Sequence, residues 1–236
     1  MFYYDWTIIV LLPAVILAGI AQGKVKSAYR RYSSVAVRNG MTGVYAARKI
    51  LDAHGLFNVP IEMVSGELTD HYDPMRRVMR LSSGVYNDAS IASVAIAAHE
   101  CGHALQHQKG YVLLTLRNII AKPVSLISMA SWPLLIIGII MTEMGKLATG
   151  NLLMHIGVIA FGAALLFHLI TLPVELDASR RALKELQMEG IVGPDEITPA
   201  KKVLSAAALT YVAALITALA PPTRSEERRV GKECRS

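Results

Sequence analysis

The sequence predicts a mainly α-helical, multi-pass membrane protein that carries a small α+β region on one side of the bilayer. Apolar residues make up 53% of the 236 positions and charged residues only 18%, whereas soluble domains average about 25% charged residues. The apolar residues gather in four long runs, and two polar segments separate these runs. The polar segments show the alternating and helical patterns of a folded region.

The four apolar runs are the predicted membrane spans. A helix needs about 20 residues to cross about 30 Å of hydrocarbon, and we expect the first three runs to cross. The first, within residues 1–23, is predicted to be a retained anchor because it lacks the basic leader of a signal peptide. The Ala-rich fourth, residues 203–220, is predicted to be a fourth transmembrane helix, with a buried helix as the alternative. The runs are Trp6 to Ala21, Val124 to Met141, Leu152 to Pro173 and Val203 to Ala220.

The second and third runs form a predicted transmembrane hairpin over residues 123–173, with a short turn between Thr142 and Asn151. A hairpin returns the chain to its starting side, so the polar segments 24–122 and 174–202 share one face of the membrane. Lys and Arg are densest just after the first run. The positive-inside rule therefore places this face in the cytoplasm.

The charge balance indicates a lipid bilayer as partner and no nucleic acid. The net charge is +6 and the pI near 9.4, but the basic residues flank apolar runs and form no basic motif interleaved with aromatics. The two cysteines, Cys101 and Cys234, give no disulfide framework. Cys101 is interpreted as a small apolar filler on a buried helix face.

The last residues differ in character from everything before them. Residues 224–236 read RSEERRVGKECRS, a charged stretch that resembles the translation of a sequencing adapter. We therefore expect this tail to be non-native and leave it out of the functional argument.

Within residues 24–122 the sequence predicts two helices and two short strands. The first helix covers Thr42 to Ala53 and stops at Gly55, and the strands cover Val59 to Val64 and Val78 to Ser82. The second helix covers Ile91 to Gln108, with Asn87 as its N-cap, Asp88 as a favourable first-turn charge and Gly110 as its end.

The second helix carries the sequence His99-Glu100-Cys101-Gly102-His103. Residues four apart lie on one face of a helix, so His99 and His103 can share one Zn²⁺ ion. Glu100 need not bind the metal and can act as general base on a zinc-activated water. This is the H-E-x-x-H arrangement of zinc peptidases, and it predicts a zincin-like catalytic region. The alternative is a surface helix with two histidines and a salt-bridging glutamate.

A catalytic zinc usually has three protein ligands and an open position. His107 is rejected as the third because eight residues of helix rise about 12 Å. Glu175 is the predicted third ligand, since it follows the third apolar run directly and on the correct side. Asp177 either accepts a hydrogen bond from a ligand histidine or pairs with Arg181 at the i+4 position.

Other candidate roles are less constrained by the sequence. His155 and His168 lie inside the third run, where a hydrogen-bonded structural role is favoured. His71 is a candidate donor to the transition state. The strand Val78 to Ser82 is either an edge strand that binds extended substrate or an ordinary strand of the sheet.

Several segments together resemble the YugP family of bacterial neutral zinc metallopeptidases, over nearly the whole of residues 1–220. This resemblance implies a multi-pass zinc peptidase of the bacterial cell membrane. The glutamate segment is also similar to that of HtpX-like membrane proteases, except that Ser179 stands where that family has Asp. The segments are Thr69 to Pro74, Arg80 to Ser82, Gly84 to Tyr86, Ala97 to Gln106, and Glu175 to Ala182.

The sequence therefore predicts a membrane-bound endopeptidase with one catalytic zinc ion, whose substrates are proteins or peptides, membrane proteins among them. The alternative is a non-catalytic membrane protein with a structural zinc site, which would need four protein ligands. An intramembrane protease is disfavoured, because the apolar part of the motif helix is too short to span and polar residues follow His103.

Overall fold

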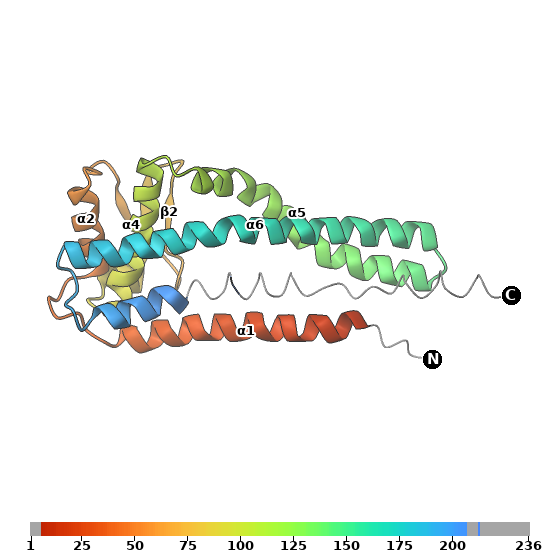
Figure 1. Cartoon of the computed structure of the whole chain (residues 1–236), viewed down its shortest axis with the longest axis horizontal. Coiled ribbons are helices and arrows are strands. Elements are labelled where there is room, and N and C mark those ends of the chain that lie inside the picture. The colour runs from red at the N-terminus through yellow and green to blue at the C-terminus, as the bar shows by residue number, and fades with distance from the viewer. Residues whose placement is uncertain (1–5, 207–211, 213–236) are drawn as a thin grey trace.

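Three long helices set the shape of the protein in the computed structural model, which describes residues 6–206 and 212. In Figure 1, α1 and the hairpin of α5 and α6 extend in the same direction from an end where the short elements gather. We call this end the head; it comprises α2, α3, α4, the small sheet and the parts of α1 and α6 that contact α4. The long helices are α1 (Trp6–Ser33), α5 (Val112–Glu143) and α6 (Leu147–Met188).

The predicted hairpin is present, and both of its helices are longer than the apolar runs. α5 ends at Glu143 and α6 begins at Leu147, within the predicted turn. Pro123 and Pro133 lie inside α5, which bends visibly in Figure 1, because proline removes a helical hydrogen bond. Pro173 lies inside α6 without ending it. The third apolar run and the segment that carries Glu175 are therefore one continuous helix.

α5 and α6 are long and apolar enough to cross a membrane, and they are the two such helices among the described residues. Only 11% and 12% of their most apolar windows are buried, so they differ from the core helices of a soluble domain. The first predicted span lies in α1, and its crossing stays a prediction. The described residues include a helix over residues 197–206, which contains only the start of the fourth run. The rest of that run lies mostly outside the described residues, and the tail 224–236 lies wholly outside them.

The head contains a three-stranded sheet in the order β1-β3-β2. β1 (Ile61–Val64) runs parallel to β3 (Val78–Ser82), and β2 (His71–Asp73) pairs with β3 in the antiparallel sense. Both predicted strands are confirmed, with β1 starting two residues later than expected. The edge-strand hypothesis for Val78 to Ser82 is wrong, because β3 has a partner on each side. The sequence analysis missed β2, which has only three residues.

Both predicted helices of the head are confirmed. α2 covers Gly43–Ala53 and α4 covers Ile91–Gln108, and Gly55 and Gly110 follow them with positive φ angles. The predicted N-cap of α4 is wrong: Ser90 caps it, and its hydroxyl accepts from the Ser93 backbone N–H at 3.1 Å. Asn87 instead ends a short helix, α3 (Ser83–Asn87).

α4 lies at the centre of the head, between α2 and α6. Most of its residues are buried, including Cys101, whose thiol lies 3.6 Å from the Ala47 carbonyl oxygen, as expected for a core filler. α6 approaches α4 closely at Gly102. A Cβ atom there would lie 2.5 Å from the Ala178 carbonyl oxygen. Glycine at position 102 therefore permits the contact that brings α6 against the motif helix.

We predict that Gly102→Ala destabilises the protein by about 1–3 kcal/mol, because the added methyl group forces two packed backbones apart. Thermal unfolding in detergent measures the effect. The matched control is Gly162→Ala, which is also helical but has nothing within 4 Å of the added carbon. Equal midpoints for the two variants would contradict the close packing described here.

Candidate metal centre

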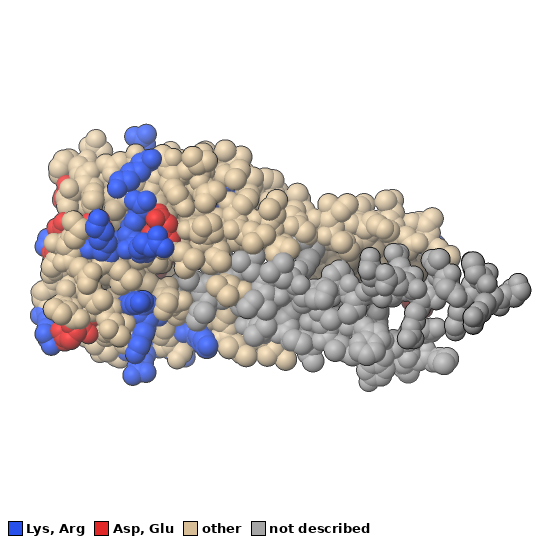
Figure 2. Space-filling view, viewed as in Figure 1, with Lys and Arg blue, Asp and Glu red and all other residues tan. Residues whose placement is uncertain are grey.

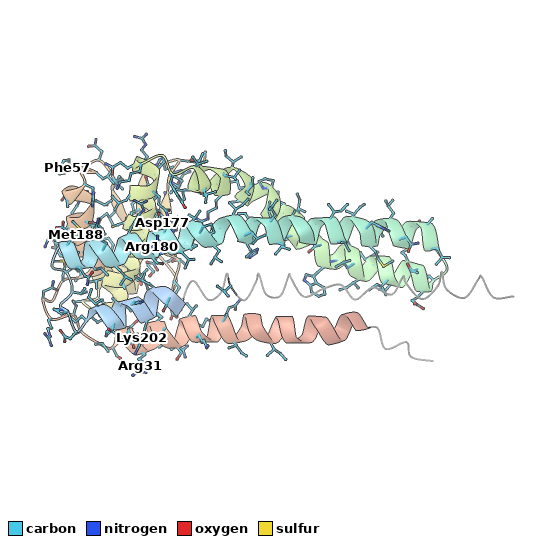
Figure 3. The ribbon with its side chains drawn as sticks, viewed as in Figure 1. Arg31, Phe57, Asp177, Arg180, Met188 and Lys202 are labelled. Carbon is cyan, nitrogen blue, oxygen red and sulfur yellow. The ribbon has the colours of Figure 1, made fainter. Side chains whose placement is uncertain are left out.

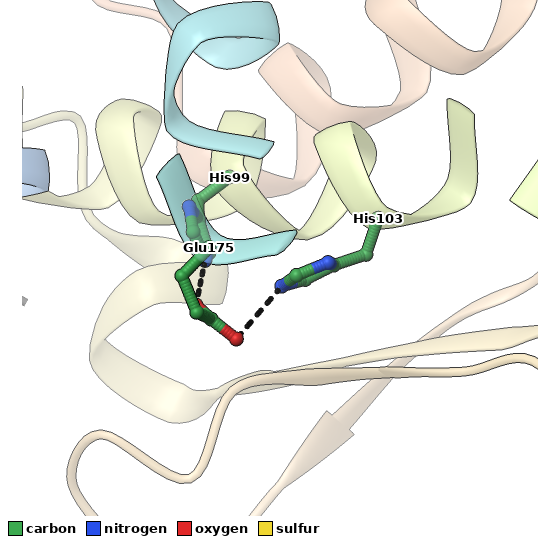
Figure 4. A group of neighbouring side chains, drawn as sticks. All are labelled: His99, His103 and Glu175. Carbon is green, nitrogen blue, oxygen red and sulfur yellow. Dashed lines mark hydrogen bonds and ion pairs between the residues drawn. The ribbon is translucent and has the colours of Figure 1, made fainter. Parts of the chain in front are cut away.

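α4 and α6 bring three potential metal ligands together (Figure 4). His99 Nε2 lies 3.1 Å from Glu175 Oε2, and His103 Nε2 lies 3.7 Å from Glu175 Oε1. The three donor atoms all lie within 4.8 Å of one another. The histidines share a face of α4 because they are four residues apart, and Glu175 faces them because α6 packs on Gly102.

This donor set fits zinc. Two nitrogen ligands and one carboxylate oxygen are a usual protein set for catalytic Zn²⁺, with bonds of about 2.0–2.2 Å. Two ligands of a tetrahedral ion with such bonds lie about 3.4 Å apart, close to the two separations between Glu175 and the histidines. All three side chains are largely buried, and the Glu175 side chain is 8% exposed.

A second hydrogen bond orients each histidine. His99 Nδ1 lies 3.2 Å from the Ser179 hydroxyl oxygen, and His103 Nδ1 lies 3.0 Å from the Gln106 side-chain oxygen. If Nδ1 donates in both cases, each Nε2 keeps a lone pair for the metal. Ser179 and Glu175 thus contact opposite ring nitrogens of His99.

Gln106 connects one histidine to the carboxylate group of Asp177. Its amide nitrogen donates to the Val174 carbonyl oxygen at 2.8 Å and to Asp177 Oδ2 at 2.9 Å. Because the Gln106 amide nitrogen donates to two groups on α6, the amide oxygen is the end that faces His103. Asp177 also accepts from Arg181 Nε at 2.6 Å. The predicted Asp177–Arg181 pair is therefore present, and Asp177 reaches a ligand histidine only through Gln106.

Arg117 is the contact that the sequence analysis missed. Its Nη2 atom lies 3.0 Å from Glu175 Oε1, and its side chain is 25% exposed. Arg117 comes from α5, the helix that follows the motif helix in the sequence. The available signal was a single arginine in the otherwise apolar start of α5, where a cation needs a buried partner.

Glu100 lies beside the metal-binding group without joining it. Its residue is 7% exposed, and Oε2 accepts from the backbone N–H of Tyr72 in β2 at 2.9 Å. Burial raises the pKa of the Glu100 carboxyl from 4.5 to about 7, against the opposing effect of His99 and with a further rise from Glu175. A carboxyl with its pKa near neutrality can both take up and release a proton at physiological pH.

The remaining histidines lie outside the group of three. His107 Nδ1 is 3.0 Å from the Tyr72 hydroxyl, which agrees with its rejection as a ligand. His71 contacts the Thr69 carbonyl oxygen and lies 3.4 Å from Arg80. His155 and His168 each contact a carbonyl oxygen four residues earlier in α6, in line with the structural role favoured above.

Comparison with known proteins identifies the family of the chain. A family model described as "Putative neutral zinc metallopeptidase" matches residues 7–224. A Bacillus subtilis (strain 168) protein named "Putative membrane protease YugP" is 48% identical over 212 residues, which cover 90% of this chain and 91% of that relative. No solved structure matches the chain. On the strength of the family match and this relative, the chain belongs to the family of neutral zinc metallopeptidases.

Proposed function

We propose that the protein is a membrane-bound, zinc-dependent endopeptidase with one catalytic Zn²⁺ and Glu100 as general base. The observation that carries this proposal is the placement of the buried Glu100 carboxyl, held by the Tyr72 N–H, next to three clustered potential metal ligands. A perturbed acid beside a metal site is typical of hydrolytic centres.

The residues of the chain divide the work in this proposal. His99, His103 and Glu175 would hold the ion, which when bound lowers the pKa of a water molecule towards about 7 and polarises a carbonyl group. The Tyr72 N–H fixes Oε2 of Glu100, so Oε1 is available to take a proton from the attacking water. Glu100 then transfers this proton to the amine nitrogen that leaves as the peptide bond breaks.

The ligand count favours catalysis over a structural metal site. Structural zinc sites have four protein ligands and catalytic sites three. Among the residues that the structure describes, the candidate group consists of His99, His103 and Glu175. Glu100 is not a member of this group, and its Oε2 accepts from the backbone N–H of Tyr72.

The proposal places the enzyme in the cell membrane, with several spans and the head on the cytoplasmic face. The two apolar helices support membrane insertion, and the B. subtilis relative is named a membrane protease. Lys24, Lys26, Arg30 and Arg31 at the head end of α1 fit the positive-inside rule. Its substrates would be proteins or peptides that reach this face, including segments of membrane proteins.

Replacing the general base tests the proposal directly. We expect Glu100→Gln to bind about one zinc per chain, as the parent does, and to lose casein cleavage by a factor of about 10²–10⁴. Metal content by mass spectrometry and proteolysis in detergent measure the two effects. The control is Glu67→Gln, which removes an exposed carboxylate outside the site. Full activity of Glu100→Gln with bound zinc would overturn the proposed role.

Stability without metal should depend on the same carboxyl. The pKa of Glu100 is about 7 in the folded chain against an ordinary value of 4.5, so the folded state binds the proton more tightly. The free energy of unfolding of the zinc-free parent therefore falls as pH rises from about 4.5 to about 7. Glu100→Gln cannot ionise and escapes this loss, which amounts to about 3 kcal/mol.

Thermal midpoints of the chelator-treated parent and Glu100→Gln check this, with little difference expected at about pH 5 and a growing advantage of the variant towards about pH 8. A constant difference across this range would show that the Glu100 carboxyl is not buried as described.

The hydroxyl of Ser179 should contribute to metal affinity. Because it orients His99 at 3.2 Å, we expect Ser179→Ala to weaken zinc binding by about 10–100-fold. Competition with a chromogenic chelator measures the affinity. Ser128→Ala is the matched control, since that hydroxyl only donates to the Val124 carbonyl oxygen of its own helix. Unchanged affinity in Ser179→Ala would remove Ser179 from the site.

A further inference from the structure

A basic pocket lies between α1 and the helix of residues 197–206, outside the metal centre. Its volume is about 280 Å³, several times the roughly 30 Å³ that one water molecule occupies in the liquid. Two segments far apart in the sequence form its walls. The lining residues are Lys24, Ser27, Ala28, Arg31, Tyr32, Lys202, Ser205 and Ala206.

The pocket gathers three cations without an acidic partner. None of Lys24, Arg31 and Lys202 forms an ion pair with a carboxylate among the described residues. Like charges that share a pocket repel one another, and an anion placed between them removes this repulsion. Ser27 adds an exposed hydroxyl group that can donate a hydrogen bond, whereas the Ser205 hydroxyl donates to the Lys202 carbonyl oxygen at 3.3 Å. Several cations together with a hydroxyl donor suit the oxygen atoms of a phosphate group.

The position of the pocket along the molecule indicates where such a phosphate comes from. Lys24 is the first residue after the predicted anchor of residues 1–23. In Figure 3, Arg31 and Lys202 lie close together, at the same level along the long axis as Asp177 and Arg180 of α6. Figure 2 shows that the Lys and Arg side chains of this face gather at the head end. In the proposed membrane orientation, the pocket begins where the predicted anchor ends, and basic residues at the end of a spanning helix meet the lipid headgroups.

We propose that this pocket binds the phosphate group of an anionic phospholipid headgroup, and that the bound lipid links α1 to the helix of residues 197–206. The orientation rests on the proposed membrane function, but the binding itself needs neither zinc nor catalysis. At headgroup depth, lipid phosphate is far more concentrated than free phosphate in solution, so the lipid is the favoured source. Basic pockets between membrane helices bind acidic lipids for this reason.

The test compares two double variants, both in the Glu100→Gln background to prevent self-cleavage. Arg31→Gln with Lys202→Gln removes two cations from the pocket. Lys26→Gln with Lys201→Gln removes two exposed cations from the same helices, next to the pocket but not lining it. Both pairs change the net charge equally, so diffuse attraction to an acidic membrane is matched.

Each protein is held in micelles of short-chain phosphatidylcholine, and phosphatidylglycerol is added in increasing amounts. Mass spectrometry counts the phosphatidylglycerol that stays bound after washing. A basic residue near an acidic lipid surface strengthens binding about fivefold. We therefore expect each double variant to lose up to about 25-fold in phosphatidylglycerol affinity through diffuse attraction. The pocket variant should lose at least about tenfold more than the control, because it also loses charge-assisted hydrogen bonds to the lipid phosphate. Equal midpoints of unfolding in pure phosphatidylcholine confirm that both variants are folded.

Two results would overturn the proposal. Equal losses in the two double variants would show that the surface charge acts as a whole and that no site exists. Saturation of the pocket by inorganic phosphate, with no preference for phosphatidylglycerol over phosphatidylcholine, would assign it to a soluble anion. Both results are independent of casein cleavage, so a failure here is distinguishable from a failure of the proposed peptidase activity.

Discussion

The contact between α4 and α6 at Gly102 is the constraint on which the metal centre depends. A histidine pair on one helix supplies only two ligands, and the third must come from a second backbone that approaches within side-chain reach. The Ala178 carbonyl oxygen lies where a side chain on residue 102 would have to sit. Glu175 is one helical turn before Ala178 on α6, so the same contact places its carboxylate against both imidazoles.

The polar groups around the three ligands form a connected set rather than isolated pairs. Arg117 contacts Glu175, Ser179 contacts His99, and Gln106 joins His103 to α6. Such a set satisfies buried polar atoms that would otherwise be costly to bury, and it holds each ligand in one orientation. Glu100 is outside this set, and β2 supplies the backbone donor to its carboxylate. Glu100 lies on the same helix as the two histidines, and the bond from β2 fixes its carboxylate from outside that helix.

Residue spacing was enough to predict the parts of the site that lie within one helix, and the order of apolar runs was enough to predict Glu175. The i, i+4 pair His99 and His103 follows from helix geometry alone. Arg117 and the bond from Tyr72 could not be predicted in this way, because each joins elements whose relative placement depends on packing across the whole head. The N-cap was misassigned for a local reason: Asn87 and Ser90 are both good caps, and only the short helix α3 decides between them.

The continuity of α6 has a consequence for how the protein is made. The two histidines leave the ribosome well before Glu175, and the whole apolar hairpin is synthesised after His103 and before Glu175. The Glu175 carboxylate, the proposed third ligand, can reach the histidines only once α5 and α6 have formed and turned back towards the head. A nascent chain that has not yet inserted its hairpin therefore holds an incomplete metal site. In a peptidase, this order of assembly would keep hydrolysis silent until the polypeptide is in its membrane.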